Sequence, residues 1–229
     1  MDGPVVFCFP HAGGGSHQYL SWQSEFPDGM RWVAIDRAGR YSRSGELPKE
    51  RFEHLVKDLV EQLLPEIPKG QFALFGHSMG GALAFEVTRE LESRGFAPTC
   101  LFVSSTVAPP DRDEHGFRFF DMEDEQFIDH LLSLSDEGES SNREVLRAFL
   151  PDIRDEYRQY HRYNPDRNVI LETPIVALCG ADEPICASMV NWKSFTSAFQ
   201  GVFQFSGGHF YWKKNLIEVA ALISKYLNS

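Results

Sequence analysis

Short apolar runs alternate with helical patterns along most of the 229-residue chain. Turn residues bound the apolar runs, and between the runs apolar positions recur at every third or fourth residue. This alternation is typical of βαβ units, and unbroken apolar runs are typical of strands covered on both faces. We therefore expect one α/β domain with a mostly parallel central sheet and helices on both faces. The predicted strands are Val5–Phe9, Trp32–Ile35, Phe72–Phe75, Cys100–Ser104, Ile175–Cys179 and Val202–Phe205.

The clearest helical patterns lie between these strands. Apolar residues from Phe52 to Leu64 follow i, i+3, i+4, i+7 spacing, which predicts a strongly amphipathic helix. A second helix is expected from Met79 to Arg94, where Gly95 provides a C-cap, and a last one from about Leu216 to Leu227.

One segment interrupts the alternation, because about seventy residues between Ser104 and Pro174 contain no strand pattern. Helical stretches are expected near Glu123–Leu134 and Arg143–Tyr160, joined by a polar and mobile Ser135–Ser141 link. Insertions of this size are usually functional, so residues 111–168 are predicted to form a helical lid over the active site. The alternative is a peripheral helical hairpin that only covers the sheet edge. We expect apolar residues on the inner face of the lid, with Phe127 and Leu131 as the main substrate-binding candidates. These apolar residues are Phe119, Phe120, Phe127, Leu131, Leu132, Leu146 and Phe149.

The charge is concentrated in this same segment. Residues 111–168 contain 16 acidic and 8 basic residues, which is −8 of the chain's net charge of −11. No basic stripe of the kind that nucleic-acid binding requires is present, so we expect no nucleic-acid partner.

Targeting signals and cysteine pairs are not evident. The N-terminus lacks a basic region before its short apolar run, and no apolar stretch approaches the length of a membrane span, so no membrane association is expected. Cys8, Cys100, Cys179 and Cys186 show no CxxC spacing, and three lie in predicted strands, which favours reduced core thiols. We expect a cytoplasmic protein.

The pentapeptide Gly76-His77-Ser78-Met79-Gly80 follows a predicted strand and precedes a predicted helix. Strand, sharp turn and helix around a Gly-x-Ser-x-Gly core are the context of a nucleophile elbow. The helix start presents unpaired backbone N–H groups beside Ser78 that can hold negative charge. Ser78 is therefore the predicted nucleophile, and His77, which is fixed next to it, is interpreted as structural.

A serine nucleophile needs a base and an acid that orients the base, in the chain order Ser, Asp or Glu, His. His209 lies in a Gly-Gly-His-Phe loop after the last predicted strand, where sites assemble in parallel sheets. His115, His130 and His161 fall in the lid segment, where solvated surface positions are expected. Two adjacent carboxylates follow the preceding strand: Asp182 is the preferred acid, and Glu183 is the alternative.

The oxyanion hole needs two backbone N–H groups. One is expected from Met79, directly after the nucleophile, and the other from Ala12 in the Gly-rich loop after the first strand. That loop could instead cradle phosphate, but it lacks both the GxGxxG spacing and a P-loop lysine. The chemistry assigned here requires no cofactor and no metal.

With these residues in place, the chain resembles the type II thioesterases, the stand-alone editing enzymes of nonribosomal peptide and polyketide synthases. The resemblance covers nearly the whole chain and is most specific at its two ends. The matching motifs are Phe7-Cys8-Phe9-Pro10-His11-Ala12-Gly13-Gly14, Phe75-Gly76-His77-Ser78-Met79-Gly80, Leu101-Phe102-Val103-Ser104 before Ala108-Pro109, the stretch containing Tyr163, and Gly207-Gly208-His209-Phe210-Tyr211.

This resemblance implies an α/β-hydrolase fold and hydrolysis of acyl or aminoacyl thioesters on the phosphopantetheine arm of acyl or peptidyl carrier proteins. One departure concerns the loop after the second strand, where the family usually has Leu-Pro-Gly-Arg-Gly. Here Ala38 replaces the proline and Tyr41 replaces the second glycine, which weakens any analogy in acyl preference.

Carrier proteins are usually acidic, so the acidic lid is not expected to be their main docking face. A basic cluster is the predicted electrostatic landing site, and the alternative is a solvated basic loop. The cluster consists of Arg37, Arg40, Arg43, Lys49 and Arg51.

Two other functions remain open at this point. A carboxylesterase or lipase would share the triad and would prefer oxygen esters. A non-catalytic binding protein on a hydrolase scaffold is disfavoured, because every catalytic position is filled.

Overall fold

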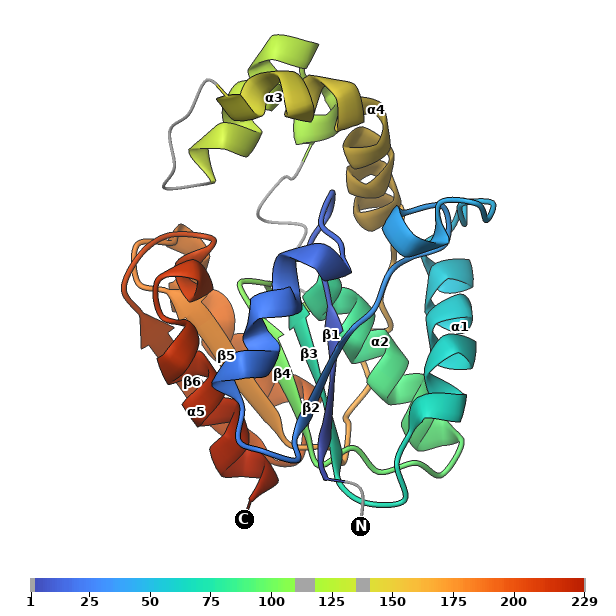
Figure 1. Cartoon of the computed structure of the whole chain (residues 1–229), viewed down its shortest axis with the longest axis vertical. Coiled ribbons are helices and arrows are strands. Elements are labelled where there is room, and N and C mark those ends of the chain that lie inside the picture. Colours follow the sequence, from blue (N-terminus) through green and yellow to red (C-terminus); the bar gives the residue numbers. More distant parts are fainter. Residues whose placement is uncertain (1–2, 110–117, 135–140, 229) are drawn as a thin grey trace.

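The computed structural model describes residues 3–109, 118–134 and 141–228. Its centre is a six-stranded sheet in which every strand runs parallel to its neighbours, in the order β2-β1-β3-β4-β5-β6 (Figure 1). The predicted α/β architecture is therefore confirmed. The strands are β1 (Val5–Phe9), β2 (Arg31–Ala34), β3 (Phe72–His77), β4 (Cys100–Ser104), β5 (Ile175–Gly180) and β6 (Phe199–Phe205).

Strand β6 begins three residues earlier than its apolar run predicts. The pairing of β6 with β5 shifts register between Ile175 and Ala177. Gly201 lies in this irregular stretch with a φ of +111°, a backbone conformation that glycine adopts without strain. Because Gly201 interrupts the run of apolar residues, the sequence pattern does not predict the first three residues of the strand.

The long helices occupy the positions that the sequence pattern indicates, within a few residues. They are α1 (Phe52–Leu63), α2 (Met79–Ser93), α3 (Asp124–Ser133), α4 (Ser141–Arg162) and α5 (Leu216–Leu227). Short 3₁₀ segments are Ser16–Glu25, Tyr41–Arg43, Leu64–Glu66, Phe119–Asp121, Pro184–Phe195 and Tyr211–Lys213.

Alternate residues of each strand face opposite sides of the sheet, and both sides are covered. On one side, Phe7, Leu74 and Val103 share a core with α1, α2 and the 3₁₀ segment Pro184–Phe195. On the other side, the intervening strand residues pack against α5 and the aromatic segment Ser16–Glu25. Burial on both faces explains why the strands are apolar throughout.

Because the sheet is parallel, the carboxyl ends of its strands meet at one edge. The register pairs Phe9 with Gly76, His77 with Ser104, and Gly180 with Phe205. The loops that follow β1, β3, β4, β5 and β6 therefore open onto the same edge, which is where open α/β sheets place their ligand sites.

Helices α3 and α4 form a separate layer beyond this edge (Figure 1). They pack on each other through a small core of Phe127, Ile128, Leu150 and Ile153. The polar link expected at Ser135–Ser141 lies almost entirely outside the described residues, as does the segment 110–117 that leads into this layer.

The cysteine prediction is wrong for one pair. Cys179 at the end of β5 and Cys186 in the following 3₁₀ segment are joined by a disulfide, with their Cα atoms 5.5 Å apart. The chain turns back on itself after Gly180, which brings together two cysteines that have no recognisable motif spacing. Cys8 and Cys100 are free and buried, as expected. Within the part of the chain that the structure describes, no helix combines the length and apolar character that crossing a membrane requires.

The start of α2 lies so close to β1 that its contact tolerates only glycine. A Cβ atom on Gly80 would lie 1.9 Å from the Phe9 carbonyl oxygen, and one on Gly76 would lie 2.1 Å from the Gly80 carbonyl oxygen. The clashing atoms belong to the backbone, so side-chain movement cannot relieve the overlap.

We expect Gly80→Ala to lower the free energy of unfolding by about 1–3 kcal/mol, the cost of overpacking a rigid contact. Urea denaturation measures this change, and Gly45→Ala is the matched control because its Cβ would have open space. Equal midpoints for the two variants would contradict this account of the α2–β1 contact.

Candidate active site

Ser78 occupies the turn between β3 and α2 in a conformation rarely adopted by residues other than glycine. Its φ is +55° and its ψ is −125°. The turn is fixed on both sides, because the Ser78 N–H donates to the Ser104 carbonyl and the Gly81 N–H donates to the Ser78 carbonyl, each at 2.8 Å. This strained strand-to-helix turn has the geometry of a nucleophile elbow.

His209 lies in the loop after β6 and contacts a carboxylate from the loop after β5. Its Nδ1 is 2.6 Å from Oε1 of Glu183. The other Glu183 oxygen accepts hydrogen bonds from the Ser105 hydroxyl and from the Gly180 N–H. A carboxylate held on Nδ1 fixes the ring and leaves its Nε2 available as a base.

The preferred acid of the sequence analysis does not occupy this position. The side chain against His209 is Glu183, the alternative, whereas Asp182 is exposed. A turn closed by a hydrogen bond from the Glu183 N–H to the Gly180 carbonyl places Asp182 at its outer corner. Glu183 follows the turn and points back toward the sheet edge, a difference that adjacent carboxylates do not reveal in sequence.

The environment of Glu183 favours its ionised form. Burial raises the pKa of this carboxyl, but the hydrogen bonds from His209 and Ser105 lower it more, so its pKa lies below the ordinary value. The carboxylate therefore stays charged at neutral pH and can stabilise an imidazolium at His209.

A further histidine lies beside this pair. His77 is buried, with its ring centroid 4.8 Å from that of His209 and its Nδ1 2.9 Å from the Ser104 hydroxyl. Burial and the neighbouring charge of His209 lower the pKa of His77 well below its usual value. Neutral and held within the sheet, His77 acts as part of the scaffold of the site.

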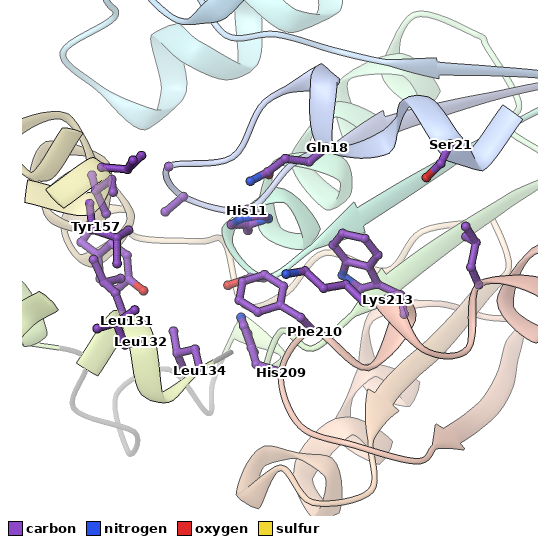
Figure 2. Close-up of a pocket in the computed structure, with 18 residues that line it drawn as sticks. His11, Gln18, Ser21, Leu131, Leu132, Leu134, Tyr157, His209, Phe210 and Lys213 are labelled. Carbon is purple, nitrogen blue, oxygen red and sulfur yellow. The ribbon is translucent and has the colours of Figure 1, made fainter. Parts of the chain in front are cut away.

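Two cavities meet at Ser78 and His209, and both include Ala12. The larger, of about 610 Å³, lies between the layer of α3 and α4 and the sheet edge (Figure 2). In Figure 2 Leu131, Leu132 and Tyr157 line one side of it and His11, Phe210 and Lys213 the other. It also contains the polar side chains of Gln18 and Ser21.

The smaller cavity, of about 440 Å³, is mostly apolar. It extends from Met79 between the end of β4, the layer of α3 and α4, and the loop after β5. Its walls include Val107, Phe119, Leu134, Tyr160 and Ile185. Met79 and Ala12, whose N–H groups are the predicted oxyanion-hole donors, thus both lie beside Ser78 at this cavity.

The structure separates the residues predicted for the inner face of the lid. Phe119, Leu131, Leu132 and Leu146 line one or other cavity. Phe127 does not: it is fully buried between α3 and α4, with the Arg154 guanidinium 4.8 Å from its ring centre. Helical spacing cannot distinguish an apolar residue that faces a cavity from one that faces the neighbouring helix.

The lid histidines are not all at the surface. His130 stacks on Phe119 with ring centroids 3.7 Å apart and lines the smaller cavity, which corrects its expected solvated position. Burial lowers the pKa of His130 to about 4, so the ring is neutral at physiological pH. His161 is exposed, and His115 lies outside the described residues.

The basic cluster is not an open landing site. Arg37 is buried and paired with Glu156 of α4, to which Arg40 also binds. Arg43 and Lys49 share Asp58 of α1. The remaining member, Arg51, pairs with Glu53. These cations bind the chain's own carboxylates, and most of them hold the loop after β2 against its neighbours.

Comparison with known proteins shows the family of this chain. Residues 4–227 match the family model described as "Thioesterase domain". The chain belongs to the thioesterase family. Its resemblance to type II thioesterases is thereby confirmed, and it is a thioester hydrolase of the serine-hydrolase type.

Among thioesterase relatives, the chain is 32% identical over 230 residues to "Thioesterase PikA5" of Streptomyces venezuelae, covering 97% of this chain and 80% of that protein. It is 30% identical to "Gramicidin S biosynthesis protein GrsT" of Aneurinibacillus migulanus, covering 97% and 88%. Its fold is similar to the "type II thioesterase BorB from the borrelidin biosynthetic cluster", with a TM-score of 0.87, 31% identity and coverage of 98% and 93%.

If Glu183 orients His209 in this thioesterase, Glu183→Gln should lower kcat about 10²- to 10⁴-fold, because a neutral amide no longer stabilises the imidazolium. Asp182→Asn is the matched control and should keep kcat within about twofold. Steady-state kinetics on a short acyl thioester measures both variants. A larger loss from Asp182→Asn would return the acid's role to that residue.

Proposed function

We propose that this thioesterase hydrolyses acyl or aminoacyl thioesters carried on the phosphopantetheine arm of carrier proteins, and that it edits misprimed or stalled synthase modules. The observation that carries the chemistry is the carboxylate–imidazole pair of Glu183 and His209 beside the strained turn at Ser78. The sequence motifs support the carrier-bound substrate, as do the names of the relatives, which place those proteins in gramicidin S biosynthesis and in the borrelidin biosynthetic cluster.

In the proposed reaction Ser78 Oγ attacks the thioester carbonyl while His209 Nε2 accepts the serine proton. The resulting oxyanion is stabilised by the N–H groups of Ala12 and Met79. Collapse breaks the C–S bond, and His209 returns the proton to the departing thiolate. Water, deprotonated by His209, then attacks the acyl-enzyme. The bond between the acyl carbon and Ser78 Oγ breaks, His209 returns the proton to Oγ, and the acid is released.

The two cavities suit the two halves of such a substrate. The apolar cavity of about 440 Å³ is the proposed acyl site, because its walls offer mainly hydrocarbon and aromatic surface. The cavity of about 610 Å³ is the proposed path of the pantetheine arm, whose amides and hydroxyl groups need polar partners. Gln18, Ser21 and Lys213 provide polar side chains along it.

The layer formed by α3 and α4 is proposed to act as the lid, within the segment 111–168. Residues of both helices line the cavities that contain Ser78, which supports a lid over the alternative of a hairpin that only covers the sheet edge. A carrier-borne arm has to pass between this layer and the sheet edge while its carrier stays outside.

The function is tested by incubating the protein with several acyl-carrier proteins and measuring the released acid by mass. We expect Ser78→Ala to lower kcat about 10⁴- to 10⁶-fold without unfolding, since the covalent intermediate cannot form. A variant that keeps a tenth of the wild-type rate would contradict the assigned nucleophile. Much faster hydrolysis of small oxygen esters than of carrier thioesters would favour a carboxylesterase.

Acyl-length preference should depend on the smaller cavity. Ile185→Phe adds volume at the wall of the smaller cavity and should reduce kcat/KM for long acyl groups more than for acetyl.

Leu131→Ala, in the larger cavity, should change KM for carrier thioesters more than the ranking of acyl groups. Phe127→Ala should mainly lower the melting temperature, because Phe127 belongs to the lid core. An unchanged ranking in Ile185→Phe would place the acyl site elsewhere.

A further inference from the structure

We propose that Glu156 of α4 is a positioning residue for the oxyanion hole, so that the seating of the lid helix fixes the catalytic loop after β1. The proposal rests on the proposed function, because it takes the Ala12 N–H as an oxyanion donor. It concerns the fixed geometry of residues 10–14, which α4 and the loop after β2 hold in place.

The buried carboxylate of Glu156 joins α4 to this loop directly. Its Oε2 accepts the Gly13 N–H at 2.6 Å, across 143 positions of sequence. Gly13 has a φ of +75°, and a Cβ at this position would lie 2.7 Å from Cγ1 of Ile153. Helix α4 therefore packs directly against the Gly13 backbone, and a larger residue at position 13 would push the helix away.

Glu156 also holds the guanidinium that organises the rest of the loop. Arg37 and Glu156 form a two-pronged pair, with N–O distances of 3.0 Å and side chains only 3% and 4% exposed. The same guanidinium donates to the carbonyl oxygens of Pro10, His11 and Gly14, at 3.0 to 3.2 Å. A charged pair with this many partners is geometrically demanding, because a displaced group would leave buried charge unpaired.

These contacts determine where the Ala12 N–H points. In a planar trans peptide unit, the carbonyl and the following N–H point in opposite directions. The Ala12 N–H shares its unit with the His11 carbonyl, which is bound by Arg37 and by the Gly14 N–H. The next unit ends in the Gly13 N–H, which is bound by Glu156. Ala12 is thus flanked by two fixed peptide units and directs its own N–H away from Arg37.

Tyr41 completes the arrangement from a third direction. Its hydroxyl donates to the Gly13 carbonyl, and its ring lies where a Cβ on Gly15 would be. Tyr41 has a φ of +46°, in the region that favours the glycine usual for this family position. Tyr41 therefore keeps a backbone conformation that favours glycine, and its side chain binds the loop after β1.

Because Glu156 is one residue before Tyr157, which lines both cavities, the same turn of α4 contacts the substrate cavities and the oxyanion loop. Figure 1 shows α4 reaching from the lid layer down toward α1 and the loop after β1. Displacement of α4 from this seat separates Glu156 from both Gly13 and Arg37, and the oxyanion hole loses its fixed geometry.

The test is Glu156→Gln in the full chain, with Asp152→Asn as the matched control. Asp152 lies one helical turn away and pairs with Arg40, so the control also removes a carboxylate charge between α4 and the sheet domain but leaves Gly13 and Arg37 bound. We expect Glu156→Gln to lower kcat about 10- to 100-fold with KM within about twofold, since a misplaced oxyanion donor costs rate rather than substrate binding. Asp152→Asn should stay within about twofold in both constants.

A second measurement distinguishes positioning from a general loss of structure. An alkyl boronic acid, which forms a tetrahedral adduct with an active-site serine, should bind Glu156→Gln more weakly by the same factor as kcat falls. Wild-type kcat in Glu156→Gln, or a raised KM with kcat unchanged, would overturn the inference.

If Glu156→Gln does not fold, Glu156→Asp decides. It keeps the charge opposite Arg37 but shortens the side chain that reaches the Gly13 N–H, so it should lower kcat about threefold or more, and a wild-type kcat would overturn the inference. The outcome is separable from the function itself: an active Ser78→Ala contradicts the proposed reaction, whereas an inactive Ser78→Ala beside a fully active Glu156→Gln contradicts only the role of Glu156.

Discussion

The backbone contact between the start of α2 and the end of β1 is the constraint on which the site depends. Gly76 and Gly80 lie within the distance at which any Cβ would meet a carbonyl oxygen, so β3 can turn directly into α2 with Ser78 at the apex. That turn presents the serine and the first N–H groups of the helix at the same point of the sheet edge. It also sets α2 beside the loop after β1, which provides the second predicted oxyanion donor.

Around this point, the parallel sheet places residues from distant parts of the sequence together. Ser78, Glu183 and His209 follow three different strands, and the shared polarity of these strands brings their ends to one edge. The chemistry needs little else from the sheet. The layer of α3 and α4 borders this edge, and two cavities of different polarity lie between them, which suits the proposed substrate with an acyl half and a polar arm.

The charges near the site serve the architecture more than long-range attraction. Arginines of the loop after β2 were expected to attract an acidic partner, yet they bind Glu156, Asp152 and Asp58 within the chain. Burial makes the Arg37–Glu156 pair a rigid joint rather than a surface feature, because neither group can leave the other without leaving charge unpaired. The joint links α4 to the loop that is proposed to stabilise the oxyanion.

The sequence by itself determined the features that depend on neighbours along the chain. Unbroken apolar runs predicted buried parallel strands, and the glycines around Ser78 predicted the turn, since both are local requirements of backbone and burial. The family resemblance followed from motifs at both ends of the chain and is confirmed. Only the tertiary structure placed Glu183 rather than Asp182 against His209, because the direction of a side chain after a turn depends on what the turn packs against. It likewise placed Phe127 in the lid core and joined Glu156 to Gly13, contacts across layers that no local pattern records.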